Sequence, residues 1–367
     1  MTFLTAAIAL FTISLALSAF LTALVKSLAS KRGFVCHPVE DRFHQKTVPL
    51  GGGIAIFVTM TAIIIAAMAA VKFHIATGFP AQLGDTVAEY AENFLGKITQ
   101  LVIILMCVLV LFLLGLWDDR KHLGPFVKLA GQFIVAIAAA GFANIRVEFF
   151  IESRMITTLL SAFWIVLIIN AFNFLDNMDG LSAGIAAIAS CILFTAAAIS
   201  GQVFVGGIAI VFVGALVGFL LFNFPPAKIF MGDAGSLVVG FFVAFLTLRT
   251  TYYHEAQSGQ WYPVFLPVLV MAVPLYDFIS VTFLRIKQGK SPFIGDTQHF
   301  SHRLKKRGLT DTQTVLTLYL ATLATGLGAT FLYQVNSAGA ILIFIQTFMV
   351  LAIIAILETT GNEQRRD

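Results

Sequence analysis

The chain is built from repeated runs of about 20 predominantly apolar residues, the length that an α-helix needs to cross the hydrocarbon core of a bilayer. Hydrophobic residues make up 59% of the sequence and charged residues only 11%, whereas a soluble domain has roughly a quarter charged residues. The mean hydropathy of +0.92 points the same way. The sequence therefore predicts an all-α integral membrane protein and excludes an ordinary soluble one.

Counting these runs predicts eleven transmembrane helices. No basic residue precedes the first run, and Lys26 follows it, so we expect a retained span rather than a cleaved signal peptide. An odd number of spans places the two termini on opposite sides of the membrane. The expected spans lie near 3–25, 50–72, 98–116, 128–145, 155–175, 181–200, 203–223, 236–250, 263–284, 315–335 and 339–357.

The positions of Lys and Arg predict the orientation, because cytoplasmic loops carry an excess of them. With the N-terminus outside and the C-terminus cytoplasmic, 18 of the 23 Lys and Arg residues fall inside. Five fall outside: Lys72, Lys97, Arg146, Arg154 and Arg249. We expect one polytopic domain over 1–367, with its chemistry in about 42–308. The net charge of +4 gives no case for a nucleic-acid partner.

Several polar motifs fall on the predicted cytoplasmic face. Asp118 and Asp119 end the third run, and adjacent carboxylates repel one another, which tends to leave one of them usable as a base. The alternative is an acid pair neutralised by Arg120 and Lys121. Nothing in the two residues by themselves decides between these interpretations.

The fifth run ends in a polar stretch. At about 100° per residue, Asn173, Asp176 and Asp179 share one face of a helix end, or of the turn that continues it. Polar groups are costly in membrane helices and are usually functional. The alternative is a set of hydrogen bonds that holds helices together.

A glycine-flanked carboxylate, Asp233, lies between the seventh and eighth runs. Flanking glycines allow a ligand to approach the backbone closely. A lone carboxylate in such a turn suits a hard cation that keeps waters and phosphate oxygens as its other ligands. The alternative is a helix N-cap made by Asp233 or Ser236.

The two longest inner loops are basic. In 285–314, His299, His302 and Arg303 precede a Lys-Lys-Arg run, which suits a diphosphate with its metal, or lipid headgroups. Asp277, about 12 Å inside the preceding run, is expected to be functional or paired. In 26–49, His44 and Lys46 precede a glycine triplet, Gly51 to Gly53, against which a neighbouring helix or a phosphate can pack.

Together these motifs resemble, in order and topology, the polyprenyl-phosphate N-acetylhexosamine-1-phosphate transferases. The resemblance rests on Asp118-Asp119, the segment 170–180, the segment 228–236 and the loop from His299 to Arg303. It implies transfer of a sugar 1-phosphate from a UDP-sugar to undecaprenyl phosphate, with release of UMP, at the inner membrane of a bacterium. Mg²⁺ is the implied cofactor, with Mn²⁺ as a substitute, and a homodimer is an open expectation.

The resemblance also implies roles for individual residues. Asp118 would deprotonate or position the lipid phosphate with Asp119 beside it, and Asp233 and Asn173 would hold the metal against the diphosphate. The implied substrate-binding residues are Asn170, Asp176, Asp179, Lys128, His299, His302, Arg303, His44 and Lys46.

The last inner loop is similar to that of the branch that transfers N-acetylglucosamine 1-phosphate to begin a cell-envelope glycan. Two positions depart from the pattern of that branch: Ser301 stands where a histidine is usual, and Asn177 where glycine is common. Other UDP-amino sugars, such as UDP-N-acetylfucosamine or UDP-MurNAc-pentapeptide, stay open as donors. A transporter of anionic lipids is the alternative from another class, although it would place its polar groups nearer the bilayer midplane.

Overall fold

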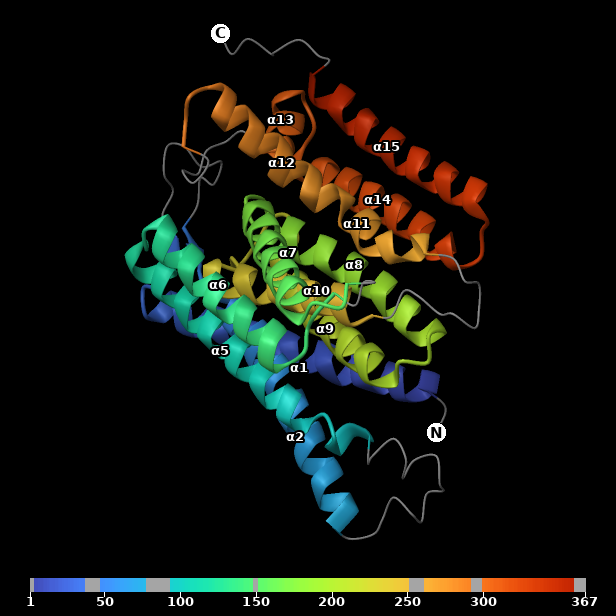
Figure 1. Cartoon of the computed structure of the whole chain (residues 1–367). Coiled ribbons are helices and arrows are strands. Elements are labelled where there is room, and N and C mark those ends of the chain that lie inside the picture. The colour runs from blue at the N-terminus through green and yellow to red at the C-terminus, as the bar shows by residue number, and fades with distance from the viewer. Residues whose placement is uncertain are drawn as a thin grey trace.

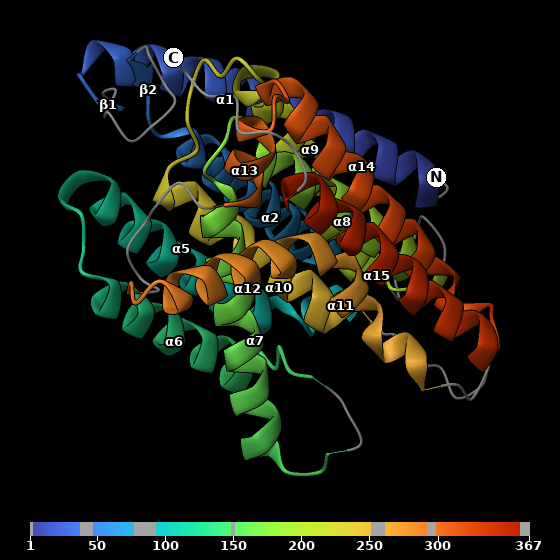
Figure 2. The ribbon, with the colours of Figure 1, turned by 90° about the horizontal axis from the view of Figure 1, so that it is seen from above.

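The computed structural model describes residues 3–36, 47–76, 93–147, 151–250, 261–291 and 299–359. Within these ranges the regular elements are helices, apart from one short antiparallel hairpin, β1 (Val35–Cys36) with β2 (Val48–Pro49), and an isolated bridge between Leu50 and Phe230. The hairpin lies beside the end of α1 (Figure 2). The all-α prediction is confirmed for the part of the chain that the structure describes.

The helices follow the predicted runs closely, although several extend beyond the apolar stretch at one end. They are α1 (Phe3–Lys31), α2 (Gly52–Ala76), α5 (Ile98–Lys121), α6 (Pro125–Phe142), α7 (Arg154–Leu175), α8 (Leu181–Ile199), α9 (Val203–Asn223), α10 (Asp233–Arg249), α11 (Leu266–Val270), α12 (Ala272–Lys287), α13 (Phe300–Lys306), α14 (Asp311–Thr330) and α15 (Ser337–Thr359), with 3₁₀ turns at Tyr262–Phe265 and Phe331–Tyr333.

The chain is a multi-pass membrane protein, but the predicted count of eleven spans is not confirmed. Nine described helices are long and apolar enough to cross a membrane, or ten if Tyr262–Val270 and Ala272–Lys287, bent by 64°, form one span. The remaining run corresponds to α10, which has only 17 residues. The orientation that depends on this count stays a prediction.

The short helix α10 is the centre of the fold. It is apolar on all sides, as buried helices are, and Ala234 to Thr247 are all buried against α2, α5, α7, α8 and α9 (Figure 1). Gly235 lies directly against Gly53 of α2, where an added Cβ would come within 2.7 Å of the Gly53 Cα. The glycine triplet therefore serves close helix packing. The Gly52 and Gly53 amides donate to Phe230 and Met231 carbonyls.

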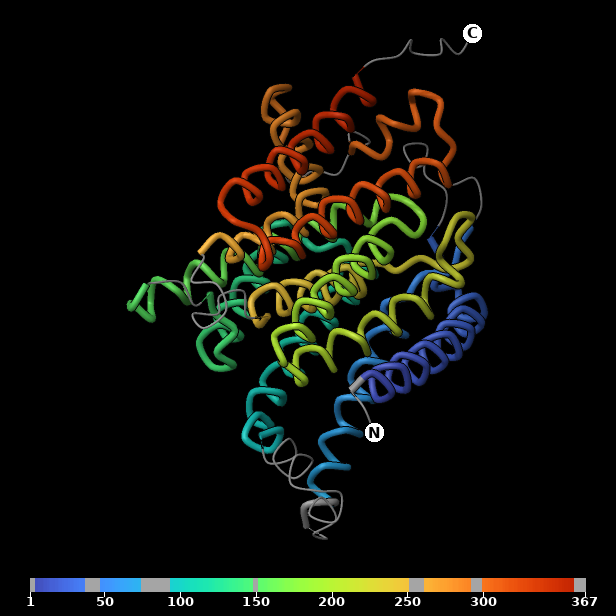
Figure 3. The backbone as a smooth tube through the Cα atoms, turned by 90° about the vertical axis from the view of Figure 1, so that its right-hand side faces the viewer, coloured from blue at the N-terminus to red at the C-terminus, as the bar shows by residue number. Residues whose placement is uncertain are grey.

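The remaining helices pack on two sides of this centre. The first helix lies along α9, where the Ser14 and Ser18 hydroxyls each donate to an α9 carbonyl at 2.6 Å, a typical small-residue membrane contact. The helices α12 to α15 gather on the other side (Figure 3). Between these layers, the end of α5, the beginning of α6, the end of α7 and the beginning of α10 meet, and their hydrogen bonds build the site described next.

Candidate functional site

The site is centred on the Lys128 ammonium. Its Nζ lies 2.8 Å from Asp118 Oδ2 and 2.8 Å from Asp233 Oδ2, so one cation from α6 joins carboxylates from α5 and α10. The Asp118 side chain is 9% exposed and that of Asp233 is 29% exposed. A buried carboxylate needs such a partner, while Asp233 keeps a surface that a ligand can reach.

Asp118 also holds the turn that places Lys128. It accepts a hydrogen bond from the Leu123 amide at 2.5 Å, and His122, with φ of 45°, closes α5 by donating to the Asp118 carbonyl. Pro125 then begins α6, a position that suits proline because the amide there has no partner in the helix. Lys128 therefore lies one turn into α6 and faces back toward Asp118.

Asp119 has a different role from its neighbour. Its carboxylate accepts hydrogen bonds from the Asp233 and Ala234 amides, at 2.7 and 3.1 Å, and so caps α10 from another helix. Gly232 is needed beside it, because its φ is +75° and an added Cβ would lie 2.8 Å from Asp119 Oδ2. The alternative of an N-cap made by Asp233 or Ser236 is therefore wrong. The acid pair contacts Lys128 and the α10 amides instead of Arg120 and Lys121, neither of which forms an ion pair with it among the described residues. Arg120 lies over the Phe34 ring.

Asn173, in the last turn of α7, completes this cluster. Its amide donates to Asp233 Oδ1 at 2.5 Å and to Ser236 Oγ at 2.8 Å. The predicted neighbourhood of Asn173 and Asp233 is therefore present. One turn earlier, Asn170 donates to Gln132 of α6 at 2.6 Å.

The sequence predicts that Asn173, Asp176 and Asp179 share one face of a helix end or of the turn that continues it. In the structure α7 ends at Leu175, so Asn173 lies in the helix and the two acids follow it. Asp176 is the C-cap of α7, and Asp179 lies in the following turn, where it accepts a hydrogen bond from the Ala227 amide at 2.8 Å. Asp179 therefore holds the α7–α8 turn against the segment before α10.

A second polar group lies between α12, α13 and α15. Asp277, fully buried, contacts His299 Nδ1 at 2.9 Å and accepts from the Phe300 amide at 3.0 Å. Of the two alternatives, functional or paired, the structure shows the pairing. His302 is also buried, and burial, together with the nearby His299, lowers its pKa to about 4.

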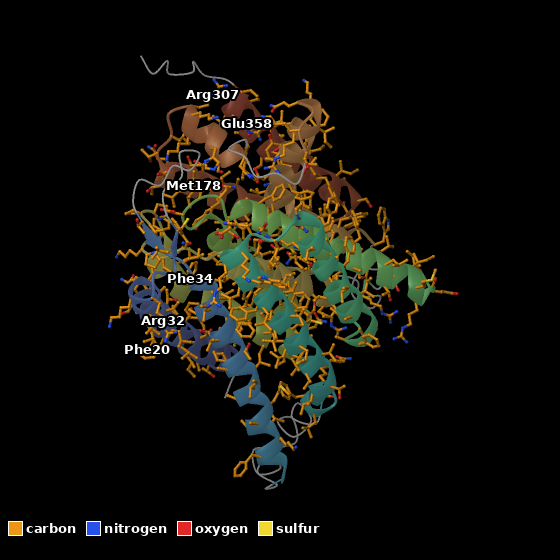
Figure 4. All side chains as sticks on the ribbon, turned by 90° about the vertical axis from the view of Figure 1, so that its left-hand side faces the viewer. Phe20, Arg32, Phe34, Met178, Arg307 and Glu358 are labelled. Atoms are coloured by element: carbon orange, nitrogen blue, oxygen red, sulfur yellow. The ribbon has the colours of Figure 1, made fainter. Side chains whose placement is uncertain are left out.

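Arg303, expected to contact phosphate, is held by protein groups. It contacts Glu358 Oε2 at 3.1 Å and donates to Ser280 Oγ at 3.0 Å. The Tyr276 hydroxyl donates to Glu358 Oε1 at 2.5 Å, and Arg307 donates to the Glu358 carbonyl at 3.2 Å (Figure 4).

The two polar groups are connected through the α7–α8 turn. The Ser301 hydroxyl donates to Asn177 Oδ1 at 2.7 Å, and the Phe174 ring packs edge to face on His299, with centroids 5.5 Å apart. The histidine-bearing helix α13 is therefore joined directly to the segment that follows Asn173.

Sequence reasoning missed three polar side chains in these groups: Gln132, Tyr276 and Glu358. Ser236 was considered only as an N-cap, whereas its hydroxyl accepts a hydrogen bond from Asn173. Glu358 had a usable signal, because it is an acid at the end of an apolar run, yet the last two runs carried no recognised motif. His44 and Lys46 lie outside the described residues, so their predicted roles stay predictions.

The donor set around Asp233 suits one kind of metal. Among the described residues, no group of three or more His, Cys, Asp or Glu side chains could hold a metal ion by itself. Mg²⁺ is commonly held by one or two carboxylates, with waters and substrate phosphates as the other ligands. Asp233, with Asp118 and Asn173 beside it, offers such a set, so these residues fit Mg²⁺ bound together with a diphosphate.

The residues of this cluster lie in the part of the chain that matches a known protein family. The model of glycosyl transferase family 4 matches residues 101–251, which include Asp118, Lys128, Asn173 and Asp233. A probable undecaprenyl-phosphate N-acetylglucosaminyl 1-phosphate transferase of Bacillus subtilis is 30% identical over 84% of this chain and 80% of its own length. The chain belongs to glycosyl transferase family 4.

Two further relatives come from other bacteria. A decaprenyl-phosphate N-acetylglucosaminephosphotransferase of Mycobacterium tuberculosis is 30% identical over 82% of this chain and 76% of its own length. An undecaprenyl-phosphate α-N-acetylglucosaminyl 1-phosphate transferase of Escherichia coli is 27% identical over 81% and 76%. The family resemblance inferred from the motifs is thereby confirmed over most of the chain.

Proposed function

We propose that this protein transfers N-acetylglucosamine 1-phosphate from UDP-N-acetylglucosamine to undecaprenyl phosphate, forming undecaprenyl-diphospho-N-acetylglucosamine and UMP. The observation that carries the proposal is the cluster in which Lys128 joins Asp118 to Asp233 at the meeting point of four helix ends. Relatives of this chain from three bacteria are named for polyprenyl-phosphate N-acetylglucosamine-1-phosphate transfer.

Phosphoryl transfer requires mainly positioning, cations and a group that handles a proton. An oxygen of the lipid phosphate forms a bond to the phosphorus that carries the sugar, and the bond from that phosphorus to the bridging oxygen breaks, so that UMP leaves with the electron pair. Asp118 orients the lipid phosphate and accepts its proton where it carries one. The Lys128 ammonium offsets negative charge on the reacting phosphates.

The remaining residues keep this arrangement in place. Asp119 caps α10 and so fixes the backbone of Asp233, while Asn173 orients the Asp233 carboxylate. Asp233 and Asn173 would hold Mg²⁺, which when bound neutralises charge on the diphosphate. Asn170, Asp176, Asp179, His299, His302 and Arg303 are proposed to contact the substrates.

We place the reaction at the cytoplasmic face of a bacterial inner membrane. The excess of Lys and Arg on the side of the motif-bearing loops supports this assignment, because basic loops are retained in the cytoplasm. The same assignment gives the site access to its donor, because UDP-sugars are made in the cytoplasm.

A different UDP-amino sugar as the donor is the alternative, and the contact between Ser301 and Asn177 is the observation that supports it. Ser301 of α13 and Asn177 of the α7–α8 turn, the two departures from the branch pattern, contact each other. A changed pair at this position would alter how the segment that carries His299 and His302 packs on the α7–α8 turn, while leaving the Lys128 cluster untouched.

The decisive experiment measures UMP release by detergent-purified protein with undecaprenyl phosphate, Mg²⁺ and a panel of UDP-sugars, with EDTA as a control. We expect release with UDP-N-acetylglucosamine, its loss in EDTA, and a decrease on the order of 100-fold or more in Asp118→Asn and Asp233→Asn. Asp311→Asn, a surface acid paired with Lys305, is the matched control. Release with a different UDP-sugar alone would replace the donor, and wild-type rates in both variants would refute the site.

A further inference from the structure

A cavity of about 700 Å³ opens at the other end of α5 from the Lys128 cluster. Its walls come from α1, α2, α5 and α9, and apolar side chains such as Ile64, Leu101 and Ile208 make up most of them. In Figure 1 the last turns of α2 and the segment leading into α5 lie together at the lower end of the molecule. This volume is within the range of small-molecule and cofactor sites.

Two cations line this otherwise apolar cavity. Lys97 precedes α5, and Arg249 is the last residue of α10. Lys97 Nζ lies 4.9 Å from the centre of the Phe204 ring, and burial together with the like charge of Arg249 lowers the Lys97 pKa. Among the described residues no carboxylate lines the cavity. Two cations that repel each other in an apolar wall favour an anion between them.

Both cations lie on the side of the membrane where Lys and Arg are expected to be scarce. Lys97 and Arg249 belong to the five basic residues on the side that the distribution of Lys and Arg assigns to the outside, where such residues are few. Both stand at helix ends, where the headgroups of a bilayer lie, while the cavity walls extend along α2 and α9 toward the hydrocarbon region.

We propose that this cavity binds an anionic phospholipid, with the headgroup phosphate at Lys97 and Arg249 and an acyl chain along the apolar walls. A free phosphate would not use the apolar walls, and a zwitterionic lipid would bring a second positive charge to the two cations. The site is separate from the proposed active site, because the 21 residues from Lys97 to Asp118 along α5 span about 32 Å.

Native mass spectrometry of the full-length protein in detergent tests this proposal with three probes: dioleoyl phosphatidylglycerol, dioleoyl phosphatidylcholine and inorganic phosphate. We expect one tightly retained phosphatidylglycerol, weak retention of phosphatidylcholine and no retention of inorganic phosphate. Lys97→Gln and Arg249→Gln should each weaken phosphatidylglycerol binding about fivefold, and the double variant about 20-fold. Lys97→Arg should retain binding, and so should Lys72→Gln, which removes an exposed cation of α2 on the same side.

A second variant tests the apolar part of the site without changing charge. Gly207 lines the cavity and an added Cβ there meets no atom within 4 Å. Gly207→Leu should therefore narrow the cavity and weaken phosphatidylglycerol binding, while the protein keeps its melting temperature without lipid. Equal binding of phosphatidylglycerol to wild type and to the Lys97 and Arg249 variants would overturn the proposal. The proposal would also be overturned if phosphatidylcholine were retained as well as phosphatidylglycerol, or if inorganic phosphate bound tightly. Wild-type binding of phosphatidylglycerol to Gly207→Leu would overturn it too.

Discussion

Ser301 of α13 donates a hydrogen bond to the side chain of Asn177, 2.7 Å away in the turn between α7 and α8. These are the two positions at which the chain departs from the motif pattern of the branch it resembles. Their contact explains both departures together, because a histidine at 301 would have to share this fully buried position with the Asn177 side chain. The pair connects the histidine-bearing helix to the segment that begins with Asn173.

We therefore expect the two positions to be energetically coupled. Ser301→His alone should lower the melting temperature and the transfer rate, whereas Ser301→His with Asn177→Gly should recover a large part of both. The coupling energy in a double-mutant cycle of unfolding should be about 1 to 2 kcal/mol. Strictly additive effects of the two substitutions would show that the hydrogen bond carries no coupling.

The adjacent acids Asp118 and Asp119 should respond differently to substitution. Asp119→Asn loses one of two bonds to the α10 amides, so we expect a destabilisation of about 1 to 3 kcal/mol together with lower activity. Asp118→Asn should abolish activity with a smaller change in melting temperature, because Asp233 still pairs with Lys128. Thermal melts and UMP release on the same preparations check this, and the reverse ranking of stabilities would contradict the capping role.

Metal binding should depend on Asp233 more than on the other acids. Mg²⁺ or Mn²⁺ added with the UDP-sugar should raise the melting temperature of the wild type and fail to raise that of Asp233→Asn. The control variant Asp311→Asn should show the same rise in melting temperature as the wild type. If the metal raised the melting temperature of Asp233→Asn as much as that of the wild type, the metal would have to bind elsewhere.

Glu358 should stabilise the end of the fold, although it lies on the last helix. Glu358→Ala leaves Arg303 without its carboxylate and Tyr276 without its acceptor, so we expect a loss of about 3 kcal/mol in unfolding free energy. Glu358→Gln should lose less, since it keeps an acceptor for Tyr276. Glu152→Gln, at an exposed position before α7, is the control and should have no effect.

Acid should destabilise the protein partly through His302. Its pKa of about 4 in the folded protein lies below the ordinary 6.5, so between these values the unfolded chain binds a proton that the folded chain does not. Stability should therefore fall as the pH decreases from 6.5 toward 4. His302→Gln should flatten this part of the curve in thermal melts, and an unchanged curve would show that His302 titrates normally in the fold.

The sequence by itself determined the membrane class, the approximate positions of the helices, the family and most members of the Lys128 cluster. It could do so because a bilayer imposes a length and an apolarity on each span, and because carboxylates at the ends of such spans are rare enough to be informative. The glycines on both sides of Asp233 likewise indicated, from the sequence, positions where another group approaches the backbone closely.

The tertiary structure alone decided which polar groups contact each other. Helical periodicity placed Asn173, Asp176 and Asp179 together, but α7 ends at Leu175, and Asn173 contacts Asp233 whereas Asp179 contacts the Ala227 amide. Likewise, nothing local to Asp119 shows that it caps a helix 114 residues further along the chain. The energy of such contacts depends on which helix ends meet, and the packing of the other helices around α10 decides this. The apolar pattern of α10, which has 17 residues, does not distinguish this buried central helix from a membrane span.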